Sequence, residues 1–201
     1  MTASFFSETT QNNIFSKSDY GRSWTERNMV ELEGNVSIQS SKGYLFSMNR
    51  LNYDGKKHEF TSRDTVQMKG PNLKNPIMFL KGTGLKANIS REHFILNREV
   101  SSQKRVEDGG WLKISSKSGE FFTAESRAIF VENVVIKNKD KTGFADKAFL
   151  DVSGNEIILE GNAKIESGTH LIEGKRIKLF TDDDRIEVDQ AEGRNDNDTP
   201  R

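Results

Sequence analysis

The sequence contains no cysteine, which excludes disulfides, thiol nucleophiles and cysteine-ligated metal sites. It also contains no run of 18 apolar residues, the length that a membrane-spanning helix needs. Residues 1–13 lack the basic start and the apolar stretch of a signal peptide. If the protein works outside the cytoplasm, we therefore expect its targeting or anchoring segment to lie outside this sequence.

An excess of charge of one sign is missing as well, because 30 Lys and Arg balance 30 Asp and Glu. No overall field would attract nucleic acid or an anionic bilayer, so the balanced charge favours neither partner, and we expect no nucleic-acid partner. Apolar residues are also scarce, at 33% of 201 residues, and adding the 16 glycines still leaves the share below that of most globular chains. A sheet with one wet face needs only every second residue to be apolar, and it would suit this thin core.

Patterns of an active site are absent too. The three histidines, His58, His93 and His170, lie far apart and share no metal-binding spacing. The acidic run at 182–184 lacks the glycine and the terminal glutamate of a calcium loop. There is no nucleophile elbow, phosphate loop or dinucleotide fingerprint. We predict that the protein is not an enzyme and needs no metal and no cofactor.

Short segments with alternating apolar residues fill most of the chain. In the first of them, Val30, Leu32, Val36 and Ile38 fall on one face of a strand, with polar residues on the other. Turn sequences such as Ser153-Gly154-Asn155 separate the segments, and no window has the pattern of an amphipathic helix. The sequence therefore predicts an all-β sandwich, barrel or jelly roll.

A weak repeat runs through these segments. The sequence Leu-Glu-Gly-Asn-Val at 32–36 returns as Leu-Glu-Gly-Asn-Ala at 159–163, and more loosely at 96–100 and 130–134. The steps between first positions are 64, 34 and 29, which fits a unit of about 30 residues that is eroded once. A second strand follows each copy. The repeating unit is thus a pair of strands, and stacked pairs would make a long sheet with a continuous apolar face.

These motifs resemble the OstA-like family of periplasmic lipopolysaccharide-transport proteins, LptC and LptA. The resemblance covers residues 28 to 190 and rests on VELEGNV (30–36), LNYD (51–54), GTGLKAN (82–88), ILEGNA (158–163) and IEGKRI (172–177). The first half looks more like LptC, and residues 121–188 look closer to LptA.

The resemblance implies an open, V-shaped β jelly roll built of repeated antiparallel strand pairs. Its interior would hold the acyl chains of lipid A and pass them from the inner to the outer membrane. Neighbouring jelly rolls would join edge to edge into a transport bridge. The family implies a periplasmic location. A protein of the LptC type would also meet the inner-membrane transporter complex and carry an N-terminal membrane helix, which this sequence does not contain.

We expect three regions in the chain. Residues 1–25 show no periodicity and are interpreted as a flexible arm, residues 26–192 as a single jelly-roll domain, and residues 193–201 as a disordered polar tail.

Two sets of candidate site residues follow from the resemblance. Large apolar side chains expected to touch lipid are Phe46, Met48, Phe79, Phe94, Phe122, Phe130, Phe144 and Leu171. Residues expected on strand edges that pair with partner proteins are Val30, Leu32, Ile186 and Val188. The alternation also places Glu132 on the same face as Phe130, so we expect a β-bulge between them.

A different function stays open at this point. Every β sandwich needs an inward apolar face. The same alternation therefore also fits a repetitive surface or adhesion module with a dry core and no lipid. The two alternatives differ in whether the folded protein takes up an apolar ligand.

Overall fold

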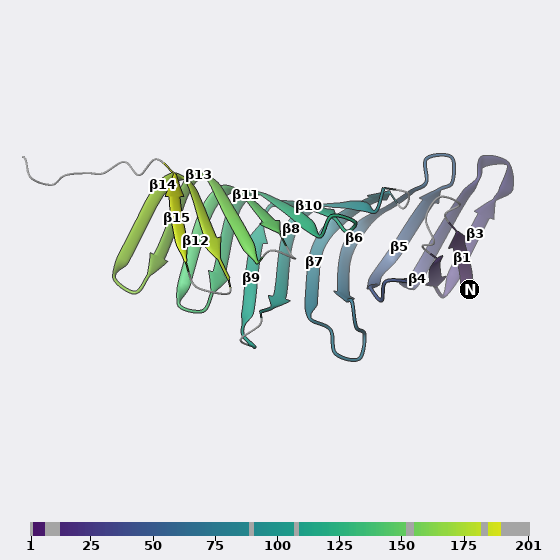
Figure 1. Ribbon diagram of the computed structural model, residues 1–201. Coiled ribbons are helices and arrows are strands. Elements are labelled where there is room, and N and C mark those ends of the chain that lie inside the picture. The colour runs from purple at the N-terminus through teal and green to yellow at the C-terminus, as the bar shows by residue number, and fades with distance from the viewer. Residues whose placement is uncertain are drawn as a thin grey trace, which may run out of the picture.

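The structure, a computed structural model, describes residues 2–6, 13–88, 91–106, 109–151, 155–181 and 185–189. Within these ranges it contains fifteen strands and one 3₁₀ helix (Figure 1). The elements are β1 (Thr2–Phe6), β2 (Asn13–Lys17), β3 (Tyr20–Trp24), η1 (Thr25–Arg27), β4 (Met29–Ser40), β5 (Leu45–Asp54), β6 (Glu59–Gly70), β7 (Met78–Asn88), β8 (His93–Arg105), β9 (Trp111–Ser116), β10 (Ser118–Phe122), β11 (Arg127–Asn138), β12 (Lys141–Asp151), β13 (Glu156–Ser167), β14 (His170–Phe180) and β15 (Ile186–Asp189).

All fifteen strands belong to one antiparallel sheet that follows the chain from β1 to β15. Most strands pair with the strands before and after them in sequence, so the sheet grows along one long axis (Figure 1). Two short strands stand off this path: β3 pairs with β4, and β9 pairs with β8 and β11. The predicted all-β fold of stacked antiparallel strand pairs is confirmed.

Each long strand bends near its middle. The pairing register shifts between Glu33 and Val36 in β4, between Val131 and Val134 in β11, and between Glu160 and Ala163 in β13. Two long strands are interrupted at the same level, one between β2 and β3 and the other between β10 and β9. The short β9 and β10 are the two parts of one such strand, because both pair with β8 and β11 on either side of a break at Lys117.

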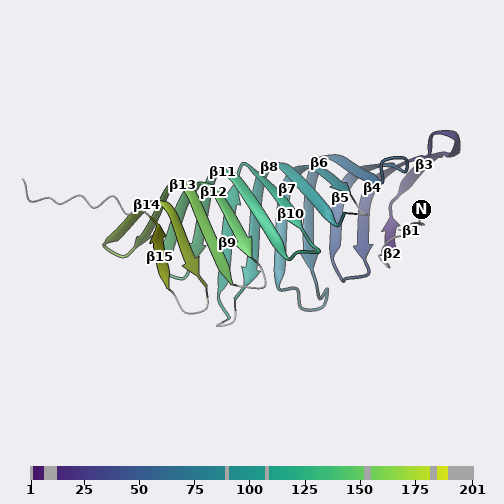
Figure 2. The ribbon, with the colours of Figure 1, turned by 45° about the horizontal axis from the view of Figure 1, so that its top comes forward.

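The row of bends divides the sheet into two half-sheets that fold toward each other. We call the diagonal strands in front in Figure 2 the front half-sheet and the strands behind them the rear half-sheet. The front half-sheet contains residues 20–24, 29–33, 50–54, 59–62, 84–88, 93–97, 118–122, 127–131, 147–151, 156–160, 176–180 and 186–189. The rear half-sheet contains 2–6, 13–17, 36–40, 45–48, 65–70, 78–82, 100–105, 111–116, 134–138, 141–144, 163–167 and 170–174.

The repeated sequence motif marks the bend. Gly34 and Gly161 occupy equivalent places and have φ angles of +77° and +76°, a conformation that glycine adopts without steric cost. A Cβ at Gly161 would lie 2.6 Å from Asp146 Oδ2, and one at Gly34 would lie 2.6 Å from Asp19 Oδ2. The following Asn162 donates to Asp146 Oδ2 at 2.9 Å. These contacts explain why glycine stands at both bends.

The third copy of the motif bends without glycine. Glu132 and Asn133 both have positive φ angles, +62° and +53°, and their side chains are exposed between the buried Phe130 and Val134. The predicted bulge is confirmed. Lys117 lies across from it and pairs with Glu132 at 2.6 Å.

The core lies between the two half-sheets. Inward side chains alternate with exposed ones along every long strand, and the most deeply buried include Phe130, Ile157, Leu159, Ile165 and Ile177. Burying one apolar side chain of this size stabilises a protein by about 1.5–3 kcal/mol. The paired half-sheets therefore supply the stability that a single flat sheet with one wet face would lack.

Two sequence-based expectations are corrected here. Residues 13–24, expected in a flexible arm, form β2 and β3, which pair with the two halves of β4. Because they cover β4, Val30 and Leu32 do not lie on an edge: Val30 pairs with Ser23 on one side and Tyr53 on the other. At the other end, β15 is the last strand of the sheet, so Ile186 and Val188 do lie on an edge strand. The predicted tail at 193–201 is outside the described residues.

The bend supports a first prediction. Gly161→Ala forces a side chain into the left-handed conformation and against Asp146, which should cost about 3 kcal/mol. For a chain of this size, we expect Tm to fall by on the order of 10 °C, measured by circular dichroism. The matched control is Gly168→Ala. It also has a positive φ, +58°, but nothing lies within 4 Å of its added Cβ, so its Tm should fall by less than half as much. If the two variants lowered Tm equally, close packing at the bend would not explain the effect.

Candidate functional site: an apolar cavity between the half-sheets

A cavity of about 180 Å³ opens between the two half-sheets. Its walls come from strands far apart in sequence, from β2 to β12. The lining is dominated by apolar side chains: Ile14, Ile38, Tyr44, Phe46, Phe60, Met68, Met78, Leu85, Ala87, Phe94, Phe121, Phe122, Ala128, Phe130 and Leu150. A cavity of about 150 Å³ is enough to hold a benzene molecule. This one is large enough for a short stretch of hydrocarbon chain.

Aromatic rings form the inner wall. Phe46 of the rear half-sheet meets Phe94 of the front half-sheet edge to face, with ring centroids 5.5 Å apart. Phe94 stacks on Phe121 at 4.7 Å, and Phe121 meets Phe130 edge to face at 5.7 Å. The alternation of the strands points these side chains inward. The contact between Phe46 and Phe94 joins the two half-sheets across the cavity.

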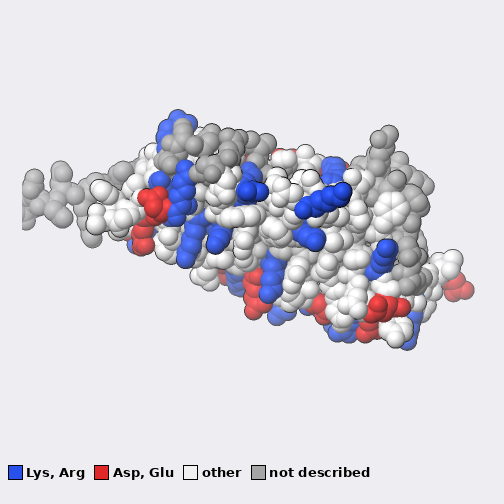
Figure 3. Space-filling model, turned by 90° about the horizontal axis from the view of Figure 1, so that it is seen from below, with Lys and Arg blue, Asp and Glu red and all other residues white. Residues whose placement is uncertain are grey.

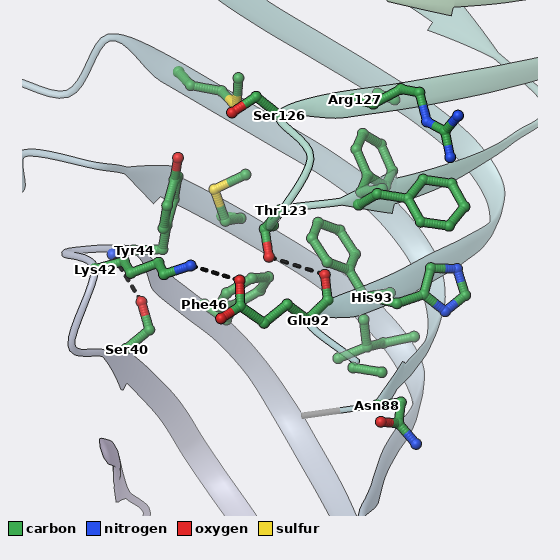
Figure 4. Close-up of a pocket in the computed structure, with 18 of the residues that line it drawn as sticks. Ser40, Lys42, Tyr44, Phe46, Asn88, Glu92, His93, Thr123, Ser126 and Arg127 are labelled. Atoms are coloured by element: carbon green, nitrogen blue, oxygen red, sulfur yellow. Dashed lines mark hydrogen bonds and ion pairs between the residues drawn. The ribbon is translucent and has the colours of Figure 1, made fainter. Parts of the chain in front are cut away.

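The mouth of the cavity is bridged by polar groups from three turns. Lys42, in the turn after β4, forms an ion pair with Glu92, in the turn before β8, at 2.5 Å (Figure 4). Thr123, in the turn after β10, donates to the backbone oxygen of Glu92 through both its amide and its hydroxyl, at 2.9 Å each. The turn containing Lys42 ends the rear half-sheet and the other two end the front one. The ion pair therefore spans the opening of the V.

The chemistry of the mouth changes over a short distance. Burial raises the pKa of the Tyr44 phenol, and the neighbouring Lys42 opposes that shift. On the other side of the mouth, Phe122 stacks on His93 at 4.8 Å, and the Arg127 guanidinium lies 4.7 Å from the centroid of the same Phe122 ring. Apolar surface thus passes directly into a rim with the cations Lys42 and Arg127, both of which are substantially exposed (Figure 4).

Neither a metal site nor a membrane-spanning helix is part of this arrangement. Among the described residues, no group of three or more His, Cys, Asp or Glu could hold a metal ion. In the same part of the chain, no helix is long and apolar enough to cross a bilayer.

Comparison with known proteins places the chain in a family. The family model described as "Lipopolysaccharide-assembly, LptC-related" matches residues 3–105, which is just over half of the 201 residues. The chain belongs to this LptC-related family. The setting of its function is therefore lipopolysaccharide assembly. The match also agrees with the closer likeness of the first half to LptC.

Two further comparisons add little to this LptC-related assignment. A search of curated proteins found no match. A crystal structure of LptH, described as the LptA homologous periplasmic component of the conserved lipopolysaccharide transport device from Pseudomonas aeruginosa, aligns with 94% of this chain and 89% of its own. The identity is 14% and the TM-score is 0.29, so low that the alignment supports no inference about this LptC-related chain.

Half of the side chains predicted to touch lipid line the cavity. Phe46, Phe94, Phe122 and Phe130 do so, and Met48 is buried in the core without reaching it. Their contact with lipid stays a prediction.

The other three predicted lipid contacts lie outside the cavity. Phe79 is exposed on the outer face, next to the inward Leu80, and Leu171 is exposed beside a turn. Phe144 is half-buried on the outer face, because the neighbouring Gly143 and Ala145 are the residues that point inward. These positions do not support a place on an internal lipid path.

Several lining residues of this LptC-related chain were missed by sequence reasoning. Phe60 and Phe121 are buried in the wall, and Tyr44 and Met68 line it near the mouth. The signal for Met68 was present, since it alternates with Val66 along β6. Tyr44 and Lys42 stand in a turn, where alternation says nothing about direction.

The ion pair at the mouth supports a second prediction. Lys42→Ala removes a partly buried bridge worth about 1 kcal/mol, so an apolar fluorescent probe should enter the cavity about fivefold faster in stopped-flow measurements. Lys57→Ala is the matched control. It breaks the ion pair of Lys57 with Asp54 in the turn at the opposite end of β5 and should leave the rate unchanged. A rate unaffected by Lys42→Ala would show that this pair does not limit entry.

Proposed function

We propose that this LptC-related protein binds the acyl chains of lipid A in the cavity between its half-sheets and passes them toward the outer membrane as one unit of a periplasmic bridge. The observation that carries the proposal is the open cavity itself, walled by Phe46, Phe94, Phe121 and Phe130 and rimmed by Lys42. It combines an apolar interior with cations at its opening. That is the order in which an acyl chain and a phosphorylated sugar head follow one another in lipid A.

The free energy available suits a carrier. A cavity that holds about six methylenes gains about 5 kcal/mol from their burial, at about 0.8 kcal/mol each. That gain lowers the cost of exposing the chain to water, yet it stays within the range of ligands that bind and leave rapidly. A longer chain needs the half-sheets to separate further at the mouth, where the bridging contacts are few and polar.

The shape of the mouth favours transfer over storage. A sealed pocket would have to open fully to release its ligand. Here the opening lies along the V, with the ion pair of Lys42 and Glu92 across it. A phosphate on the ligand can replace Glu92 as the partner of Lys42, because both are anionic acceptors of a charge-assisted hydrogen bond. The head of the lipid then stays in water while its chains lie inside.

The alternative is a repetitive surface or adhesion module with a dry core. The full burial of Ile157, Leu159, Ile165 and Ile177 shows that part of the sheet is packed as such a module would be. The cavity beside that packed region is what favours a lipid carrier. In a module that binds no ligand, an empty space would lower stability, because the aromatic side chains around it lose van der Waals contacts.

Crosslinking to lipopolysaccharide tests the proposal. A photoreactive phenylalanine analogue at Phe46 or Phe122, both half-buried in the lining, should form adducts with bound lipopolysaccharide. The same analogue at Phe79, on the outer face, is the matched control and should form few or none. The readout is a mass shift on a denaturing gel. If the folded protein gives no adduct at 46 or 122, or equal adducts at all three sites, the lipid path is wrong.

The bridge also needs a free strand edge, and β15 offers one. Phe180 N–H donates to Arg185 O at 3.0 Å, so these two residues form a hydrogen-bonded pair. Hydrogen-bonded and non-hydrogen-bonded pairs alternate along an antiparallel ladder. The pair Ile177 and Val188, three steps further, is therefore non-hydrogen-bonded, and Val188 N–H points away from β14. It is free to pair with a strand of a neighbouring jelly roll.

Proline at this edge tests the assembly. Val188→Pro removes a donor that points outward, so it should weaken association with the partner bridge protein about tenfold or more and leave the fold intact. Glu187→Pro is the matched control, because its N–H points toward β14 and its loss should lower Tm instead. Pull-down and sizing at increasing concentration give the association, and circular dichroism gives Tm. Undiminished association of Val188→Pro would remove β15 from the interface.

A further inference from the structure

The outer face of the rear half-sheet carries a group of basic residues. Lys69, Lys81, Arg105, Lys113 and Lys137 alternate with buried residues on β6, β7, β8, β9 and β11, so their side chains point outward. None of the five has an ion pair with any residue that the structure describes. The formal net charge of the chain is zero, so the acidic residues that balance these five cations lie elsewhere in the chain.

Acidic residues are missing from that face between β5 and β11. Its other outward positions on these strands hold uncharged residues, among them Ser47, Gln67, Ser101, Gln103 and Ser115. The acidic residues nearest to this face on the same strands are Asp64, Glu99 and Glu132, and all three lie at the bends. The rear face is therefore cationic over the width of five strands, which is roughly 19 Å at the usual strand spacing.

The outer face of the front half-sheet does not share this excess of basic residues. There three outward bases are paired with acids on neighbouring strands: Lys86 with Glu59 at 3.2 Å, Lys178 with Glu156 at 3.3 Å and Arg176 with Glu160 at 3.4 Å. Figure 3 views the molecule from below, the side on which turns of the rear half-sheet lie. Lys and Arg predominate over the middle of this side. The imbalance of charge is thus confined to one side of the molecule.

The register brings like charges together on the rear face. Lys113 lies directly opposite Lys137 on the adjacent strand. Like charges in directly opposite positions destabilise a sheet. An external anion that contacts both would turn this repulsion into attraction. The pair therefore points to an anionic partner for the face.

Apolar side chains lie exposed among these bases. Ile77 is 41% exposed, Phe79 38% and Trp111 37%. The rings of Phe79 and Trp111 pack together with centroids 5.8 Å apart. Lys69 is opposite Phe79, and Arg105 is opposite Trp111. Aromatic rings beside Lys and Arg are typical of protein surfaces at the boundary between lipid head groups and water.

We propose that the outer face of the rear half-sheet docks on an anionic phospholipid bilayer. The five cations lie against the phosphate groups of the surface, and Trp111 and Phe79 enter the head-group layer. An open hollow of about 460 Å³ lies on this face beside Lys69 and Lys81. The other three cations lie beyond it, on β8, β9 and β11. The whole set therefore matches a planar surface better than it matches a single small anion, whose contacts would span only two or three side chains. Docking in this way places the protein beside the membrane independently of any ligand in the cavity.

Fluorescence of Trp111 tests the docking. The chain has two tryptophans, so Trp24→Phe leaves Trp111 as the only one. Vesicles that contain phosphatidylglycerol in phosphatidylethanolamine should shift the Trp111 emission to the blue, and vesicles of phosphatidylcholine alone should not. Raising the salt should weaken the binding, because exposed charges are screened. No blue shift with the anionic vesicles at low salt would overturn the proposal.

Charge variants test which face binds. The triple change Lys69→Gln, Lys113→Gln and Lys137→Gln should weaken binding to the anionic vesicles about 100-fold, at about fivefold for each charge. The matched control, Lys86→Gln, Lys147→Gln and Lys178→Gln, removes the same charge from the front half-sheet and should change binding by less than about fivefold. Equal losses in the two triple variants would mean attraction by charge alone and would overturn the assignment of the face.

Two further measurements separate this proposal from others. Inorganic phosphate without vesicles should not shift the Trp111 emission, and a saturable shift would show a phosphate site in place of a bilayer surface. Crosslinking of lipopolysaccharide from Phe46 should be unchanged in the Lys69, Lys113 and Lys137 triple variant. Loss of that crosslink together with vesicle binding would mean that the bases serve the cavity, and it would overturn an independent docking face.

Discussion

The bend in each long strand is the constraint on which the rest of the structure depends. A sheet with apolar residues at every second position must cover that face, and this chain contains no α-helix or second sheet to do so among its described residues. Bending each strand at the same level lets the sheet cover itself. The bend needs backbone conformations that ordinary strands do not adopt, and Gly34, Gly161, Glu132 and Asn133 supply them with positive φ angles. Their side-chain neighbours, such as Asp19 and Asp146, fill the outside of the corner.

The cavity is a consequence of the same bend. Two half-sheets joined along one line are held at that line and are free to separate at the opposite side. Near the bends, residues such as Leu32, Leu51, Leu96 and Val134 are almost fully buried. Toward the mouth the walls diverge, and a polar bridge between Lys42 and Glu92 replaces continuous packing. An apolar ligand can therefore enter without disturbing the part of the core that provides most of the stability.

Folding the sheet on itself also leaves it with two outer faces, and these differ in chemistry. The front face neutralises its charges by cross-strand ion pairs, such as that between Lys86 and Glu59. The rear face keeps Lys113 opposite Lys137 and exposes Trp111 and Phe79. A flat sheet has only one wet face when the other is buried. The bend thus separates an apolar interior from two exteriors that differ in charge.

The sequence by itself determined the class of fold, the repeating strand pairs and the place of the bends. Alternation and turn residues act over a few neighbouring positions, so Leu32 to Val36 and Leu159 to Ala163 carry their own structural information. It also predicted the bulge at Glu132, because regular alternation would place this charged residue on the apolar face of the strand. The family resemblance rested on these same motifs.

Only the tertiary structure decided which of these residues form the site. Lys42 and Glu92 are 50 positions apart and meet because the sheet folds over, which no local period reports. The direction of Phe79 was hidden within the unbroken apolar run at 77–80, where parity cannot be read. At Phe144 the larger side chain points outward, because Leu159 already occupies the space that a Cβ on Gly143 would need, 3.0 Å away. The strands β2 and β3 could not be foreseen, because their short segments are stabilised by pairing with β4 and not by a pattern of their own.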